Sequence, residues 1–204
     1  MKKVCEHWSQ AFPSQNVGDY LFAEFEKRGQ AASAEIFRVK TAVEAGEIVT
    51  NLAKFTNAKK IVTVDSPLQK ATGMKEKLKS LGMLVYNTAT DIAEHAESAE
   101  IGISAVEFGI AESGSVCMDG YSFENRLVSM LPPIHIVFLN SKNIVLGITE
   151  AFEIISQVYQ QGYVSFITGP SRTADIERVL TIGVHGPSRF IIIAIDEQID
   201  GGKK

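Results

Sequence analysis

Two arginines stand where a small anion could be bound. Arg126 follows a predicted strand at 115–118, and Arg172 follows another at 164–168, in the stretch Gly-Pro-Ser-Arg-Thr. Each arginine is predicted to open a helix, where the helix dipole disfavours a cation. Each could instead pair with a nearby acidic side chain. Two such arginines at one edge of a sheet favour a carboxylate or phosphate ligand.

A glutamate interrupts an apolar stretch nearby. Glu112 lies in Ala-Glu-Ser-Gly, between predicted strands at 108–111 and 115–118. A partly desolvated carboxylate at the edge of a sheet can act as a nucleophile or a general base. The alternative is a structural carboxylate that accepts hydrogen bonds from backbone N–H groups at the strand break.

The four histidines and two cysteines do not indicate metal chemistry. No two histidines have the spacing of zinc ligands, and two cysteines cannot hold an iron–sulfur cluster. His135 and His185 are predicted at the edge opposite the arginines, and Cys117 within an apolar strand. The sequence has neither a glycine-rich dinucleotide motif nor a P-loop, so no cofactor is predicted.

The elements that must position these side chains alternate between strand and helix. Strands that are apolar throughout, separated by helices, are typical of a parallel sheet covered on both faces. Further strands are predicted at 36–39 and 83–86, and helices include one at 173–182 and one at 149–161, with Phe152, Ile155 and Tyr159 inward. We therefore predict an α/β fold with a mainly parallel sheet, in which the neighbouring strands are 60–64, 134–139, 164–168 and 190–195.

The tetrapeptide Gly-Pro-Ser-Arg occurs twice, at 169–172 and 186–189. The first copy is predicted to leave a strand and enter a helix, and the second to leave a helix and enter a strand. The two copies should then lie at opposite ends of the sheet. Ligands bind outside the carboxyl ends of such strands, so only the first copy is assigned to the site.

Length and composition indicate one compact domain. The chain has 204 residues, 45% of them hydrophobic, and a net charge of −4. We predict a loose segment at 1–16, a domain at 17–196 and a tail at 197–204. The absence of a basic block argues against nucleic acid as a partner, and the apolar runs are too short for membrane insertion. Without a signal-peptide pattern at its start, the chain is expected to be cytoplasmic.

Several motifs in one order resemble the lactate-utilisation protein C family (LutC/YkgG, the LUD domain). The resemblance covers about 20–196 and is carried by the segments 102–104, 112–115, 125–136, 169–177 and 183–187. It implies a single Rossmann-like three-layer domain of the NagB/RpiA/CoA transferase-like superfamily. It also implies a role in oxidising L-lactate to pyruvate, beside partner proteins that carry iron–sulfur clusters.

Glu112 permits a second comparison within that superfamily. Class I CoA transferases use a glutamate in Ser-Glu-Asn-Gly, whereas this chain has Ala-Glu-Ser-Gly. A stand-alone acyl- or CoA-transferring enzyme and a non-catalytic assembly module are the alternatives to a LutC-like subunit that binds a small anionic ligand. The predicted site has Glu112 as its catalytic residue and, as ligand-binding residues, Ser113, Gly114, Asn125, Arg126, Gly169, Ser171, Arg172 and Thr173.

Overall fold

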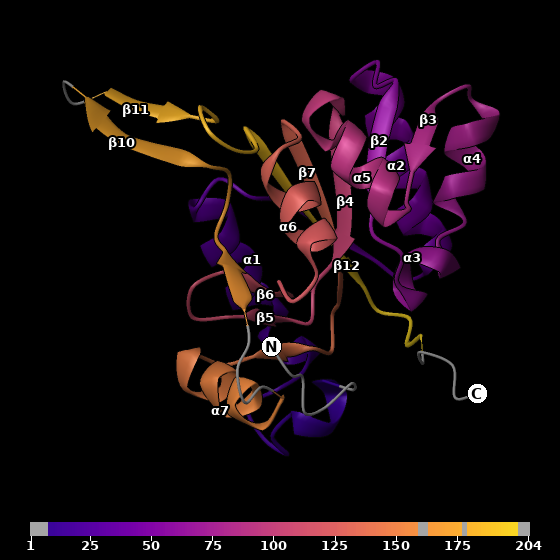
Figure 1. Ribbon diagram of the computed structural model, residues 1–204. Helices are drawn as coiled ribbons and strands as arrows, with labels where there is room; N and C mark the ends of the chain where they lie inside the picture. The colour runs from indigo at the N-terminus through magenta and orange to yellow at the C-terminus, as the bar shows by residue number, and fades with distance from the viewer. Residues whose placement is uncertain (1–7, 159–162, 177–178, 200–204) are drawn as a thin grey trace.

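A six-stranded parallel sheet forms the centre of the protein. The computed structural model describes residues 8–158, 163–176 and 179–199 (Figure 1). Neighbouring strands are, in order, β1 (Glu35–Val39), β12 (Arg189–Ile195), β7 (Ile134–Asn140), β4 (Ile101–Ala105), β2 (Lys60–Thr63) and β3 (Leu84–Tyr86). All five pairings are parallel. The predicted α/β class is therefore confirmed.

The central strands are apolar along their whole length because both faces of the sheet are covered. On one face, α2 (Ala42–Phe55), α3 (Pro67–Ala71) and α4 (Met74–Ser80) enclose a core that includes Ile136 and Ile191. On the other face lie α5 (Ala89–His95), η3 (Ala96–Ser98), α6 (Phe123–Met130) and α1 (Phe22–Ala31). Alternation along each strand therefore sends every second side chain to a separate core.

A second sheet packs on that other face. It has the order β8 (Ile144–Val145), β5 (Phe108–Ile110), β6 (Ser115–Asp119) and β9 (Val164–Ile167). Its outer side is covered by α7 (Ile148–Val158) and η1 (Trp8–Ala11), while η2 (Asp19–Leu21) precedes α1. The prediction that 164–168 joins the parallel sheet was wrong, because β9 pairs antiparallel with β6. The sequence of a short apolar strand does not indicate which of two sheets the strand will join.

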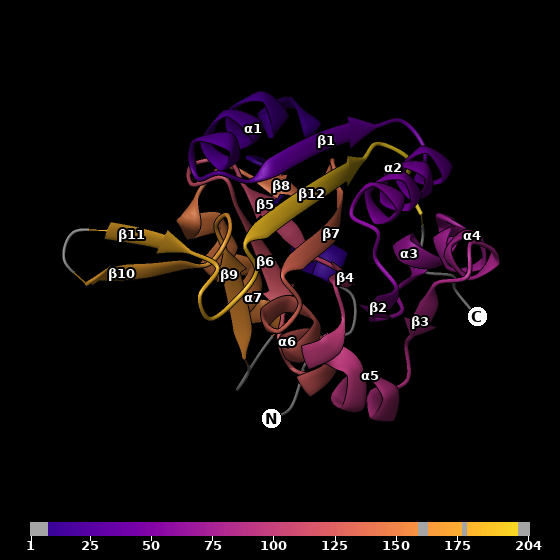
Figure 2. The same cartoon turned by 90° about the horizontal axis from the view of Figure 1, so that it is seen from above.

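An extended hairpin replaces the helix predicted at 173–182. β10 (Arg172–Ile176) and β11 (Val179–Ile182) pair antiparallel, and Figures 1 and 2 both show them reaching away from the body of the protein. The sequence alone favours a helix because Asp175 and Glu177 would complement the dipole at a helix N-terminus. The segment is nevertheless rich in Thr, Val and Ile, whose branched side chains favour strands.

Two helix predictions also need correction. The sequence predicts one helix from the Ser-Pro signal at 66–67 to Gly82, but this segment is divided into α3 and α4 at Gly73, which has a φ of 62°. Phe152 was expected to face inward, but its side chain is 57% exposed and meets Phe166 edge to face. Predictions for Tyr159 and for the last residues of the tail lie outside the described residues.

The start of α3 should respond measurably to loss of its cap. The side chain of Ser66 accepts a hydrogen bond from the backbone N–H of Gln69, and the side-chain Oε1 of Gln69 accepts one from the backbone N–H of Ser66. Ser66→Ala should lower the free energy of unfolding by about 1 kcal/mol, as a lost helix cap typically does. Urea denaturation would measure it. An unchanged midpoint would show that the cap does not stabilise the fold.

Candidate functional site

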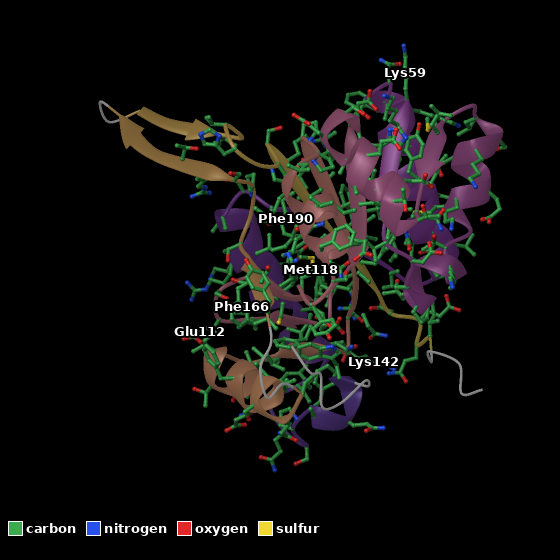
Figure 3. All side chains as sticks on the ribbon, viewed as in Figure 1. Lys59, Glu112, Met118, Lys142, Phe166 and Phe190 are labelled. Carbon is green, nitrogen blue, oxygen red and sulfur yellow. The ribbon has the colours of Figure 1, made fainter. Side chains whose placement is uncertain are left out.

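Glu112 lies in an acidic groove at the start of α7. Its Oε2 accepts a hydrogen bond from the backbone N–H of Ile148 at 3.2 Å. Glu24 and Glu150 line the same groove of about 500 Å³. Figure 3 shows Glu112 beside α7, well away from Phe190 of the central sheet. Glu112 therefore makes the backbone contact expected of a structural carboxylate rather than of a catalytic one. Glu24 and Glu150 would repel an anionic ligand from this groove.

Arg126 and Asn125 hold the loop that leads into α6. Nη1 of Arg126 donates to the carbonyl oxygen of Gly120, and its guanidinium lies 5.4 Å from the centre of the Tyr163 ring. Nδ2 of Asn125 donates to the carbonyl oxygen of Asp119 at 2.8 Å. Both side chains thus already have partners within the protein.

The first Gly-Pro-Ser-Arg lies at the same end of the parallel sheet as the second. Nη2 of Arg172 donates to the carbonyl oxygen of Ala32 at 2.8 Å, close to the beginning of β1. Arg189 begins β12 and makes a two-bond ion pair with Glu35. The prediction of opposite ends was wrong, because β9 runs in the second sheet. Arg172 also opens a strand rather than a helix.

The predicted site residues therefore do not converge on one cleft. Ser113 is exposed in the β5–β6 turn, and Gly114 packs against α1. Thr173 pairs with Thr181 in the hairpin. Of the predicted residues, two line a common cavity: Gly169 and Ser171.

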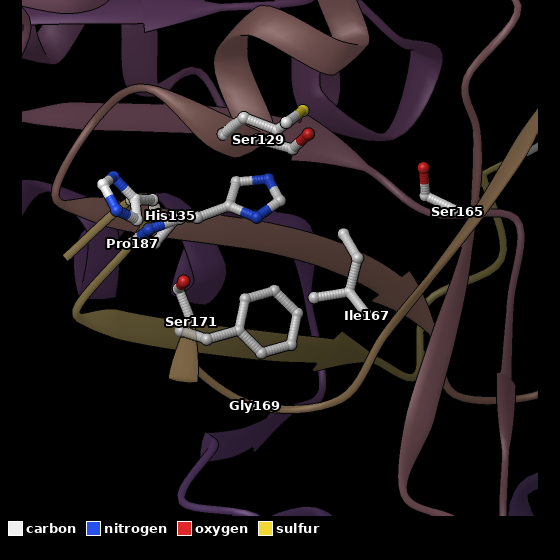
Figure 4. A pocket seen from close by; sticks show the side chains of 11 residues that line it. Ser129, His135, Ser165, Ile167, Gly169, Ser171 and Pro187 are labelled. Carbon is white, nitrogen blue, oxygen red and sulfur yellow. The ribbon is translucent and has the colours of Figure 1, made fainter. Parts of the chain in front are cut away.

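This cavity, of about 220 Å³, lies where the second sheet meets the amino ends of β7 and β12 (Figure 4). Its floor is apolar and is formed by Met130, Ile167, Pro187 and Phe190. Its polar side chains come from five separate segments of the chain: Ser129, His135, Ser165, Ser171 and His185. Among the described residues that line it, none is acidic.

Close backbone contacts build the wall of the cavity. The backbone N–H of Ser171 donates to the carbonyl oxygen of Pro187 at 2.8 Å, which joins the two Gly-Pro-Ser-Arg segments. Gly169 has a φ of 74°, and a Cβ there would lie 2.1 Å from the carbonyl oxygen of Ala32. A Cβ on Gly186 would lie 2.9 Å from the Cβ of Ser171. These glycines let three loops approach one another.

His135 is the most unusual residue of the cavity. Its side chain is fully buried, and it stands beside Phe190, with 5.4 Å between the ring centres. Nε2 lies 3.0 Å from the hydroxyl of Ser104 on β4, whereas Nδ1 has no hydrogen-bond partner among the described residues. Burial lowers the pKa of His135 to about 3, so the ring is neutral at physiological pH.

Sequence reasoning missed His135 because it applied the rule for carboxyl ends of parallel strands. A signal was nevertheless present in Leu-Pro-Pro-Ile-His-Ile, where the histidine is the only polar side chain of a six-residue apolar run. Buried side-chain nitrogens are usually hydrogen-bonded, so a histidine inside a buried strand is expected to have a polar neighbour, as His135 has in Ser104. Cys117, by contrast, is buried as expected, and burial raises its pKa.

An α/β domain with a parallel sheet and a cavity at its edge is common to many small-molecule-binding proteins. Comparison with known proteins identifies the family within this broad class of α/β proteins. A profile of the LUD domain matches residues 22–195. The chain belongs to the LUD domain family.

Several curated relatives are named lactate utilization protein C. Lactate utilization protein C of a Geobacillus strain is 30% identical over 171 residues, covering 78% of this chain and 71% of that protein. The Anoxybacillus flavithermus protein of that name is 37% identical, covering 53% of this chain and 49% of its own. The Bacillus subtilis protein is 38% identical, over 50% and 45%. The chain thus spans about half the length of most of these relatives.

A solved structure shows the same fold. The crystal structure of a DUF162 family protein from Deinococcus radiodurans matches with a TM-score of 0.59 and 18% identity. The match covers 86% of this chain and 96% of that one. Within the described residues, no helix has the length and apolar character needed to cross a membrane.

Proposed function

We propose that this chain has a LutC-type role in lactate utilisation, supporting the oxidation of L-lactate to pyruvate. The observation that carries the proposal is membership of the LUD family, together with relatives that are named lactate utilization protein C. The proposal places the chain in the cytoplasm, where lactate carbon enters metabolism.

Iron–sulfur proteins are the partners that the proposal requires. Oxidising lactate to pyruvate releases two electrons, which need an acceptor. Iron–sulfur clusters are usually held by four cysteines, and this sequence has two. The electrons would therefore pass to clusters on partner proteins, while this chain binds a small anionic ligand.

An acyl- or CoA-transferring role for Glu112 has less support. A carboxylate nucleophile must be free to attack, but Glu112 accepts a hydrogen bond from Ile148 at the start of α7. The groove around it is lined by two further glutamates. The negatively charged phosphate groups of a CoA thioester would be disfavoured beside these glutamates.

Deletion of the gene should abolish growth on L-lactate as sole carbon source and leave growth on glucose unchanged. Restoring the wild-type gene should restore growth, and the tagged chain should co-purify with an iron–sulfur protein from lactate-grown cells. The strain must lack any second lactate dehydrogenase. Normal growth of that deletion strain on lactate would overturn the proposed role.

A further inference from the structure

We propose that the free edge of β9 pairs with β9 of a second copy of this chain, which joins the two four-stranded sheets into one sheet of eight strands. This inference does not depend on the proposed function. It is argued from the backbone groups that β9 directs away from its sheet, from the absence of charge along the strand and from the exposed aromatic rings beside it.

Two residues of β9 direct their backbone groups away from the second sheet. Within the described residues, β9 pairs with β6 alone, and Figure 2 shows it beyond β6 at the margin of the body. Just before β9, the N–H of Gly120 donates to the carbonyl oxygen of Tyr163 at 2.9 Å. Hydrogen-bonded and non-bonded pairs alternate in an antiparallel ladder. Ser165 is therefore bonded to β6, whereas Val164 and Phe166 present their N–H and C=O groups to the open edge.

The other edges of the two larger sheets are protected against further pairing. β1 carries the charged side chains of Glu35 and Arg38, and β3 has three residues. The segment 16–18 covers β8, where the N–H of Gly18 donates to the carbonyl oxygen of Ile144 at 2.9 Å. Charges, short strands and covering segments are common means of blocking edge-to-edge pairing. β9 reads Val-Ser-Phe-Ile, with neither a charge nor a proline, so we expect a partner strand at its edge.

Apolar side chains stand beside the open edge. Phe166 is 38% exposed and Phe152 on α7 is 57% exposed, with 6.0 Å between their ring centres. Side chains alternate along a strand, so Val164 points to the same face as Phe166. Val164 accordingly packs against the core beneath α7. A strand added at this edge would therefore gain apolar contacts as well as backbone hydrogen bonds.

A second copy of β9 fits this edge because a strand paired antiparallel with itself is its own complement. A two-fold axis at Ser165 places Val164 of one copy opposite Phe166 of the other. The outward backbone groups of both residues then meet their counterparts, and a β-branched side chain faces an aromatic ring, which is a favourable cross-strand pair. Two copies with a net charge of −4 repel one another, so an uncharged strand is a suitable place for them to meet.

Sedimentation equilibrium of the purified chain between about 1 μM and about 1 mM tests this pairing. The contact is short, so the wild type should pass from monomer to dimer within this range rather than form a permanent dimer. Phe166→Lys brings a positive charge from each copy to the shared edge and should raise the dimer dissociation constant at least tenfold. Phe166→Pro removes an outward N–H but no bond to β6, and should have the same effect.

Phe37→Lys is the matched control, because Phe37 is 36% exposed on β1, an edge strand of the other sheet. This variant should dimerise like the wild type. Hydrogen exchange of the wild type gives a second measurement that needs no variant to fold. The amides of Val164 and Phe166 should exchange more slowly at high protein concentration, whereas the Ser165 amide should be protected equally at both concentrations.

A chain that stays monomeric up to about 1 mM would overturn the proposal. A dimer that Phe37→Lys disrupts and Phe166→Lys leaves intact would overturn it as well, because the contact would then lie on another face. Protection of the Val164 and Phe166 amides by a different protein, without self-association of this chain, would assign the edge to that protein and likewise exclude pairing between copies.

Discussion

The free energy of unfolding should fall steeply as the pH is lowered from about 6.5 to about 3, because His135 stays neutral in the folded protein. Burial lowers its pKa to about 3, whereas in the unfolded chain it is near 6.5. Between these values the unfolded chain binds one proton more. The stability contributed by the neutral ring is therefore complete above pH 6.5 and is lost toward pH 3, with a slope of about 1.4 kcal/mol per pH unit.

Urea denaturation at several pH values would measure this effect. Other groups also titrate, so the informative quantity is the difference between wild type and His135→Asn. The variant should lack the part of the pH dependence that one proton contributes, about 1.4 kcal/mol per pH unit. A His135→Asn protein with the wild-type slope would show that His135 is not held neutral by burial.

Gly114→Ala should destabilise the protein by about 2–4 kcal/mol. Gly114 has a φ of 68°, which is unfavourable for alanine, and its added Cβ would lie 2.1 Å from the backbone nitrogen of Gly29 in α1. Two backbones meet there, so neither can move aside cheaply. The contact fixes the β5–β6 turn, and hence the second sheet, against α1.

Gly73→Ala is the matched control for backbone strain. Gly73 has a similar φ of 62°, but no atom lies within 4 Å of an added Cβ. It should cost about 1–2 kcal/mol, from the left-handed conformation alone. Thermal or urea unfolding of both variants separates strain from crowding. Equal losses of stability in the two variants would mean that the contact between Gly114 and Gly29 contributes nothing to stability.

The parallel sheet could be predicted because its strands are long and apolar. Ile134–Asn140 and Arg189–Ile195 are buried on both faces, and such runs between helices have few alternatives. The start of α3 is likewise indicated by the sequence, because serine followed by proline is typical of the beginning of a helix. In these places the local pattern and the tertiary environment agree.

The candidate site was harder because it depends on which sheet β9 joins. Val164–Ile167 is apolar, like the parallel strands, but it pairs antiparallel with β6. That pairing carries Gly169 and Ser171 to the amino ends of β7 and β12, where His135 lies. The arginines were assigned to a ligand from a helix-dipole argument, yet the structure gives both of them protein carbonyl partners. Contacts between residues far apart in the sequence therefore decide both where the cavity forms and which groups the arginines bind.

The most direct test of the account is the protonation of His135, observed by ¹⁵N NMR of histidine-labelled protein. The chain has four histidines, so the His135 signal can be identified by its absence in His135→Asn. Because burial lowers the pKa of His135 to about 3, we expect a neutral ring at pH 5 in the folded protein. A ring that is positively charged at pH 5 would contradict this expectation.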